Sequence, residues 1–147
     1  MEIAGEHRFE APRQLVYEML LDPKALQASM PGCEKFEEVG PQSYDLTIRV
    51  GIAAIKGTYH GNVKVADPKA PDSYRLVVTG SGLPGSVQGD AAMALTDDGS
   101  GTLVKYTGDV KAQGAIARMG SRLLGGAAKL MIGQFFKAME KQVSQRV

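Results

Sequence analysis

The sequence predicts an α+β fold in which a curved antiparallel sheet of seven strands wraps around a long C-terminal helix, with two short helices between the first and second strands. Apolar residues alternate with a period of two along most of residues 1–112, and turn residues separate these runs. A final segment instead repeats its apolar residues at steps of three and four, as a helix does.

The N-terminal part predicts one strand and two short helices. "EIAGEHRF", residues 2–9, alternates weakly and then meets Pro12, a residue favoured in the first turn of a helix. Apolar residues recur at helical spacing over residues 13–21, and Asp22-Pro23 ends that helix and begins another that runs toward Met30.

The middle of the chain predicts six strands joined as a meander. The turn signals between them include "GPQ", "GIAA" at residues 51–54, "ADPKAPD", "GLPG" and "DDGSG". Pro84-Gly85 has the residue pair of a type II turn, which predicts a hairpin there. The predicted strands cover residues 33–40, 43–50, 55–65, 73–82, 86–96 and 102–112.

The last element is predicted as a long helix from Gln113 to Lys141. Its greasy, basic stretch "RMGSRLLGGAAKLMIGQFFKAMEKQV" raises the question of a membrane span. Lys129 interrupts the apolar run before it reaches the roughly 18 residues that a spanning helix needs. We therefore expect it to cover the sheet rather than to cross a bilayer.

Composition places the chain among soluble globular proteins. With 147 residues, 44% hydrophobic and 22% charged, it fits a single domain over residues 1–147. The N-terminus has charges where a signal peptide needs an apolar core, and one cysteine cannot form an internal disulfide, so a cytoplasmic location is expected.

Charge is unevenly distributed although the net charge is only +1. Residues 111–147 contain seven basic residues and one acidic residue, a net charge of +6. Residues 1–110 contain ten basic and 15 acidic residues, a net charge of −5. The small net charge excludes a strong overall electrostatic attraction to nucleic acid. The uneven distribution predicts a basic C-terminal helix that packs on an acidic remainder of the domain.

Glycines occupy the strand positions that should face the helix. They are Gly57, Gly61, Gly80, Gly89 and Gly108, and the helix adds its own small residues. Glycine inside a strand marks a bulge, a bend or the close approach of a ligand, and five of them remove volume from a core. We infer an internal apolar cavity; a helix lying unusually close to the sheet, or glycines that only let the sheet curl, would explain the same pattern.

A cavity of this kind suits a greasy ligand with one or two oxygens, because only Tyr59 and Tyr106 offer polar tips. Methionines add adaptability to a variable guest, although filling an irregular core is their commoner use. The predicted ligand-contacting residues are Met30, Tyr59, Val63, Met93, Tyr106, Leu123, Ala127, Met131 and Phe135.

The sequence gives little support for a catalytic site or a metal site. Cys33 has no evident base near it, and two histidines and one cysteine lack metal-ligand spacing. Asp97-Asp98-Gly99 is a hairpin signal rather than a calcium loop, and Gly80-x-Gly82 is not a phosphate loop. An enzyme in which Tyr59, Tyr106 or Arg49 handles a proton stays as a third alternative.

Several motifs resemble those of the CoxG family, named for a subunit of carbon monoxide dehydrogenase, within the START-like helix-grip (SRPBCC) superfamily. "FEAPRQLVYEMLLDP", "LQASMPGCEKFEEVG" and "GSRLLGGAAK" carry the resemblance, which covers nearly the whole chain. It implies a helix-grip fold with a hydrophobic pocket and an accessory role beside molybdenum hydroxylases of the CO dehydrogenase type.

The resemblance also implies membrane recruitment of the partner enzyme and an isoprenoid quinone or other lipid as ligand, with no tightly bound cofactor. Many family members carry a C-terminal apolar anchor, whereas this sequence stops at "VSQRV", so we expect peripheral contact rather than insertion. The expected function is that of a non-catalytic hydrophobic-ligand-binding accessory protein. A recruitment scaffold with a vestigial pocket is the alternative.

The two halves of the predicted helix present opposite apolar faces. Met119, Leu123 and Leu130 fall on one side and Ile132, Phe136 and Val143 nearly opposite, so either the helix bends near Gly133 or its last turns leave Phe136 facing outward. Beside lysines, such a surface suits an anionic membrane or an acidic partner, and a homodimer contact or a curved core helix explains it equally well. The predicted contact residues are Lys129, Phe136, Lys137 and Lys141.

Overall fold

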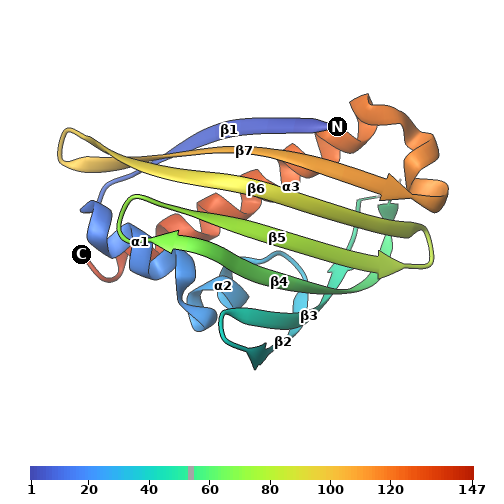
Figure 1. The fold of residues 1–147 in the computed structure, drawn as a ribbon, viewed down its shortest axis with the longest axis horizontal. Helices are drawn as coiled ribbons and strands as arrows, with labels where there is room; N and C mark the ends of the chain where they lie inside the picture. Colours follow the sequence, from blue (N-terminus) through green and yellow to red (C-terminus); the bar gives the residue numbers. More distant parts are fainter. Residues whose placement is uncertain (53–54) are drawn as a thin grey trace.

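The computed structural model describes residues 1–52 and 55–147 and has the predicted α+β architecture. Two short helices follow the first strand, and one long helix ends the chain (Figure 1). In chain order the elements are β1 (Glu2–Phe9), α1 (Arg13–Leu21), α2 (Pro23–Ser29), β2 (Cys33–Gly40), β3 (Ser43–Val50), β4 (Gly57–Lys69), β5 (Ser73–Gly82), β6 (Gly85–Asp98), β7 (Gly101–Gln113), the 3-10 helix η2 (Gly114–Met119) and α3 (Gly120–Ser144).

The seven strands form one antiparallel sheet in the order β1-β7-β6-β5-β4-β3-β2. Strands β2 to β7 pair in sequence order, and β1 adds to the edge of β7. The sheet curves around α3, and α1 and α2 lie at the end where α3 finishes (Figure 1). Local pairing thus builds a concave face that the last helix covers.

Local signals explain the two short helices. The backbone N–H of Ala25 donates to the side chain of Asp22 at 3.0 Å, which caps α2, and Pro23 occupies the first helical position. On α1, Val16 and Leu20 are buried one turn apart, so the helix packs its apolar stripe inward.

The predicted alternation of the strands is confirmed. Along β4, Tyr59, Val63 and Val65 are buried, whereas Thr58 lies outside this inner face. Pairing brings equivalent inner positions of neighbouring strands side by side, since Val63 faces Val78, Val78 faces Gly89 and Gly89 faces Val110. Inner-face residues therefore line up in rows across the sheet.

The hairpin predicted at Pro84-Gly85 is present, but its turn lies one residue earlier than expected. Gly82 pairs with Gly85, so Leu83 and Pro84 form the loop and Gly85 already begins β6. Gly85 has φ +139°, and a Cβ there would overlap the carbonyl oxygen of Gln113. The glycine is thus required by a close backbone approach. The turn predicted at residues 51–54 lies partly outside the described residues.

The predicted long helix is two helices. Residues 114–119 form η2, and α3 starts only at Gly120, whose φ of +81° interrupts the helical path. From there α3 runs without a break to Ser144, so the alternative of a bend at Gly133 is not needed to bury one side.

Two separate hydrophobic clusters form the core. The larger cluster joins α1, α2 and the C-terminal half of α3 to the sheet, with Phe9, Leu20, Val104 and Met139 almost completely buried. The smaller cluster lies at the other end, around Val50, Ile55, Tyr59 and Ile116. The interior between them is the region of functional interest.

Candidate functional site

The inward face of α3 is set by residues three or four apart. Leu124, Ala127 and Met131 pack against the smaller cluster, and Ile132, Phe135, Phe136, Met139 and Val143 against the larger one. Glycine and alanine occupy much of the first half of this helix, whereas the second half has large side chains. The side-chain volume that α3 contributes to the interior therefore decreases toward its N-terminus.

The prediction that Phe136 faces outward is wrong. Its side chain is only 3% exposed, and its ring stacks on His7 and on Tyr106, with centroids 5.3 and 5.7 Å away. His7 Nε2 lies 2.9 Å from a carboxylate oxygen of Glu140 one turn further along α3. Contacts from β1 and β7 thus hold the C-terminal half of α3 against the sheet and decide which apolar side is buried.

The middle of the interior is less tightly packed than its two ends. Val78, Val87 and Val110 of the sheet and Met131 of the helix face this region and are only half-buried. At Gly89, a Cβ would meet only ordinary contacts, 3.9 Å from the oxygen of Asp109 and from a methyl of Val110, and the same holds at Gly80. We call this part of the interior the central region.

Four of the five predicted glycines fall into two groups. A Cβ at Gly61 would overlap the carbonyl oxygen of Thr79, and one at Gly108 would crowd Asp90 and Ala91, so these two positions follow from close backbone packing of the sheet. At Gly80 and Gly89 a Cβ would instead meet only ordinary van der Waals contacts, so close packing does not require a glycine there. The closest backbone approaches of α3 are to α1, α2, η2 and β1, so a helix pressed onto the middle strands is not the explanation.

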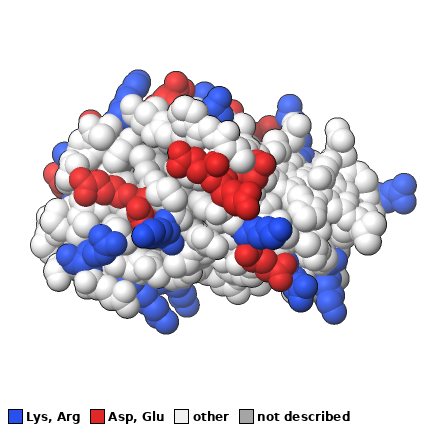
Figure 2. Space-filling model, turned by 90° about the horizontal axis from the view of Figure 1, so that it is seen from below, with Lys and Arg blue, Asp and Glu red and all other residues white. Residues whose placement is uncertain are grey.

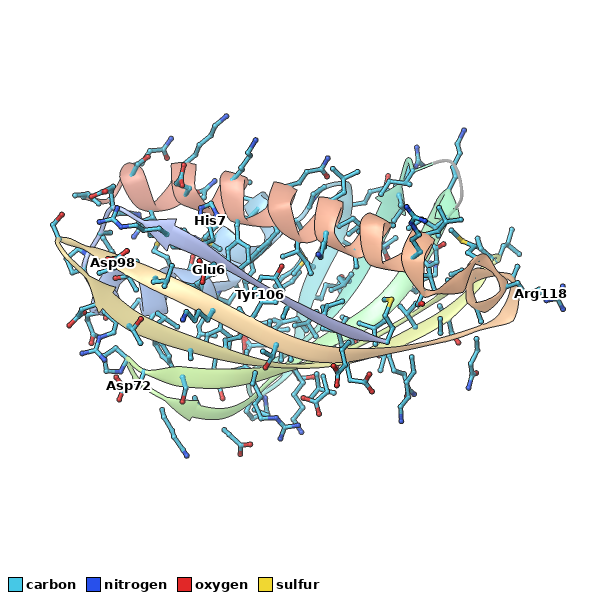
Figure 3. The ribbon with its side chains drawn as sticks, turned by 90° about the horizontal axis from the view of Figure 1, so that it is seen from above. Glu6, His7, Asp72, Asp98, Tyr106 and Arg118 are labelled. Atoms are coloured by element: carbon cyan, nitrogen blue, oxygen red, sulfur yellow. The ribbon has the colours of Figure 1, made fainter. Side chains whose placement is uncertain are left out.

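The two tyrosine hydroxyls are directed away from the central region. Tyr59 donates to the carbonyl oxygen of Ile55 at 2.7 Å. The ring of Tyr106 covers Gly5 of the paired strand, where any Cβ would overlap the hydroxyl; Figure 3 labels this residue. Burial raises the pKa of both hydroxyls. The central region is therefore more apolar than predicted.

Most of the predicted ligand residues converge on the interior. Tyr59, Val63, Met93 and Tyr106 are buried on the inner face of the sheet, while Met30, Ala127, Met131 and Phe135 are partly buried against the two clusters. Leu123 is the exception, since 59% of it is exposed on the outer side of α3. Leu124 takes the inward position because it lies three residues before Ala127 and seven before Met131.

Sequence reasoning missed Leu124, Ile116, Val50 and Ile48 as interior residues of the smaller cluster. The helical spacing of Leu124 was visible in the sequence. The other three depend on how η2 and the end of β3 close over the interior, which no local pattern indicates.

A groove of about 620 Å³ lies between the start of β1 and the N-terminal half of α3. The sulfur of Met1 would be 3.7 Å from a Cβ at Gly125, so the first residue extends along the helix there. Polar and basic side chains, among them Ser121, Arg122 and Lys129, line this groove. Its lining residues are Met1, Glu2, Ser121, Arg122, Gly125, Gly126 and Lys129.

The outer side of α3 is basic and partly apolar. Lys129, Lys137 and Lys141 are exposed, as predicted, and Leu123 and Leu130 are 59% and 51% exposed. The apolar residues of the outward surface thus come from the first half of α3, not from Phe136. No helix in residues 1–52 and 55–147 is long and apolar enough to span a membrane.

The described residues contain no cluster of three or more metal-binding side chains. Cys33 is half-buried, its Sγ contacts the carbonyl oxygen of Lys35, and burial raises the pKa of its thiol. Arg49 is exposed and lies 3.6 Å from a carboxylate oxygen of Glu34, away from the central region. None of these positions assembles the acid–base pair that an active site would need.

Comparisons with solved structures confirm the architecture. A conserved protein from Geobacillus kaustophilus is 34% identical, with 99% of this chain and 96% of that chain covered and a TM-score of 0.95. A START superfamily protein from Mycobacterium smegmatis is 12% identical over 99% of both chains, with a TM-score of 0.77. A protein from Thermus thermophilus is 16% identical over 99% of both chains, with a TM-score of 0.74. The last two likenesses show the fold alone.

No functionally curated protein matches the chain. The family model for CoxG, a subunit of carbon monoxide dehydrogenase, matches residues 5–144, from β1 to the last turn of α3, and so includes both clusters and the central region. A seven-stranded sheet curved around one long helix, as in the START superfamily, and this match over nearly the whole length show that the chain belongs to the CoxG family.

Proposed function

We propose that this protein is a non-catalytic accessory protein of a CO-dehydrogenase-type molybdenum hydroxylase, and that it holds an isoprenoid quinone between the sheet and α3. It would act in the cytoplasm at the inner face of the membrane and link the hydroxylase to it. The observation that carries the ligand part is the central region, where apolar side chains are only half-buried and a Cβ at Gly80 or Gly89 would meet only ordinary contacts.

The chemistry of the region matches a quinone in two respects. Its walls are valine, methionine and alanine side chains, which suit a flexible isoprenoid tail. The groove beside it offers hydrogen-bond donors from Ser121, Arg122 and Lys129, which suit the carbonyl oxygens of a quinone ring. We infer that the tail occupies the central region and that the ring stays near the groove.

The first experiment is solvent extraction of the protein purified from its own host, followed by mass spectrometry of the extract. A stoichiometric isoprenoid quinone is the expected result. If no apolar molecule is recovered and added quinone also fails to bind, the ligand part of the proposal fails.

A second experiment fills the central region. Gly89→Leu should place a bulky side chain in the central region and reduce quinone binding at least about tenfold. Gly133→Leu is the matched control, because Gly133 is exposed on α3 and a Cβ there meets nothing within 4 Å. Equal quinone affinity of both variants and the parent protein would contradict the proposed location.

A recruitment scaffold with a vestigial pocket is the alternative, and the exposed lysines of α3 favour it. Such a scaffold would bind its hydroxylase equally well with and without Gly89→Leu and would carry no ligand. Co-purification of the hydroxylase with the parent protein and this variant, combined with the mass spectrometry, separates the two functions.

A further inference from the structure

The loop that joins β5 and β6 exposes a large apolar side chain at its tip. Leu83 is fully exposed, whereas two-residue hairpin loops ordinarily use glycine, asparagine or aspartate. A single exposed leucine is common on soluble proteins, so its surroundings decide whether it means anything.

The neighbours of Leu83 are small and uncharged. The carbonyl oxygen of Pro84 accepts from the backbone N–H of Ile116 at 2.9 Å, which holds η2 against the loop. Ala115 and Ala117 of η2 are exposed there. We call the surface formed by Leu83, Pro84, Ala115 and Ala117 the hairpin end; it is a protruding, apolar tip.

Positive charge surrounds the hairpin end. Gly57 lies against the ring of Pro84, which brings the exposed Lys56 beside the loop, and Arg118 projects from η2 (Figure 3). Arg122 lies four residues later, in the first turn of α3. In Figure 2 the right-hand end of the molecule, which carries this hairpin, shows Lys and Arg but no Asp or Glu.

The sequence explains this charge pattern. Residues 46–66, 73–89 and 110–139 include the hairpin end and the segments on either side of it in sequence, and they contain no Asp or Glu. Among the described residues, Lys56, Arg118 and Arg122 have no ion-pair partner. No ion pair among the described residues therefore neutralises these charges, although Glu2 lines the same groove as Arg122.

We propose that the hairpin end docks on an anionic lipid bilayer, with Leu83 inserted at the headgroup level and Lys56, Arg118 and Arg122 on lipid phosphates. A bilayer is favoured over an acidic protein because the tip is convex and small, and a stable protein interface needs about 800 Å² on each partner. Lipid headgroups close around a protruding leucine, and nearby bases add attraction to anionic lipid.

Docking at this end has a consequence for the ligand. Ser121 and Arg122 both line the groove and follow Arg118 by three and four residues. A quinone leaving the bilayer would thus meet the groove directly. This part rests on the proposed function, whereas the docking itself does not require a ligand.

The test is co-sedimentation of the full chain with vesicles of phosphatidylcholine alone or with about 30% phosphatidylglycerol, an anionic content to which basic surfaces respond. The parent protein should bind the anionic vesicles and release them at high salt. Leu83→Ser and Arg118→Gln should each weaken binding about fivefold. Quinone binding in detergent, measured in parallel, should not change.

Matched controls come from elsewhere on the surface. Val39→Ser removes an exposed apolar side chain from β2, and Lys24→Gln removes an exposed base from α2; neither should affect vesicle binding. Equal loss in test and control variants, or no binding to anionic vesicles, would overturn the docking surface. Binding only to the purified hydroxylase, lost with Leu83→Ser, would assign the hairpin end to a protein partner instead.

Discussion

At the scale of the residue, glycines on the same face of one sheet have opposite surroundings. Gly61 lies so close to the carbonyl oxygen of Thr79 that a methyl group would overlap it, whereas Gly89 borders the central region. Composition alone treats the two positions alike. Their difference separates a glycine that sheet packing requires from one that it does not require.

Gly61→Ala should lower the free energy of unfolding by roughly 1–3 kcal/mol, because the backbone of β5 must move to admit the methyl group. Gly89→Ala should change it by less than about 0.5 kcal/mol, since its new methyl meets only ordinary contacts. Urea denaturation followed by circular dichroism measures both. A larger loss for Gly89→Ala than for Gly61→Ala would show that the central region is tightly packed.

At the scale of the element, α3 shows where sequence patterns stop being decisive. Two sets of apolar residues predict different buried sides of this helix. Leu123 and Leu130 mark one side, and Ile132 and Phe136 mark the other, while the glycines and alanines between them fit either side. The rings of His7 and Tyr106 select the second side by stacking on Phe136. Because His7 and Phe136 lie near opposite ends of the chain, no local pattern could have shown this contact.

Phe136→Ala should therefore cost about 3–5 kcal/mol of unfolding free energy, because it leaves a cavity among buried aromatic rings. Leu123→Ala, on the outer side of the same helix, should cost less than about 0.5 kcal/mol. Thermal and urea unfolding of the two variants measures both losses. A larger loss of unfolding free energy for Leu123→Ala than for Phe136→Ala would indicate that Phe136 faces outward.

The exposed glycines of α3 offer a second prediction at this scale. Gly133→Ala should stabilise the protein by about 0.5–1 kcal/mol, because alanine favours the helix and nothing lies within 4 Å of the added methyl. The midpoint of urea unfolding should rise. A fall would mean that this position touches something in solution, such as a second copy of the chain.

The strands were more predictable than the helix. Alternation alone identified the inner positions of β4 to β7, because a period of two leaves only two faces and the apolar residues mark one of them. The sequence therefore located Tyr59, Val63, Met93 and Tyr106 correctly. It did not reveal that both tyrosine hydroxyls turn away, because those contacts depend on the backbone of Ile55 and on Gly5 of the paired strand.

At the scale of the whole molecule, burial raises the pKa of Tyr17, Tyr44, Tyr59, Tyr74 and Tyr106, which are all five tyrosines of the chain. Tyr74 is the most strongly affected. In the unfolded chain these hydroxyls lose their protons near pH 10, whereas the folded protein retains them.

The unfolded state then binds fewer protons than the folded state, so the free energy of unfolding should fall as pH rises above about 10. Below that pH the contribution is fully present. Tyr74→Phe should make the alkaline decrease shallower than in the parent protein, as measured by urea midpoints between about pH 8 and 11. Identical pH profiles would show that Tyr74 is ionised as easily when folded as when unfolded.

The division of the core into two clusters predicts that the two ends of the molecule open independently. The larger cluster fixes α1, α2 and the C-terminal half of α3, whereas the smaller cluster, at the end with η2, contains four buried residues among those that the structure describes. Amide hydrogens of η2 and the first turns of α3 should exchange with solvent well before those of α1, α2 and the last turns of α3. Transient opening at that end would admit a bulky guest to the interior while the rest of the fold stays intact.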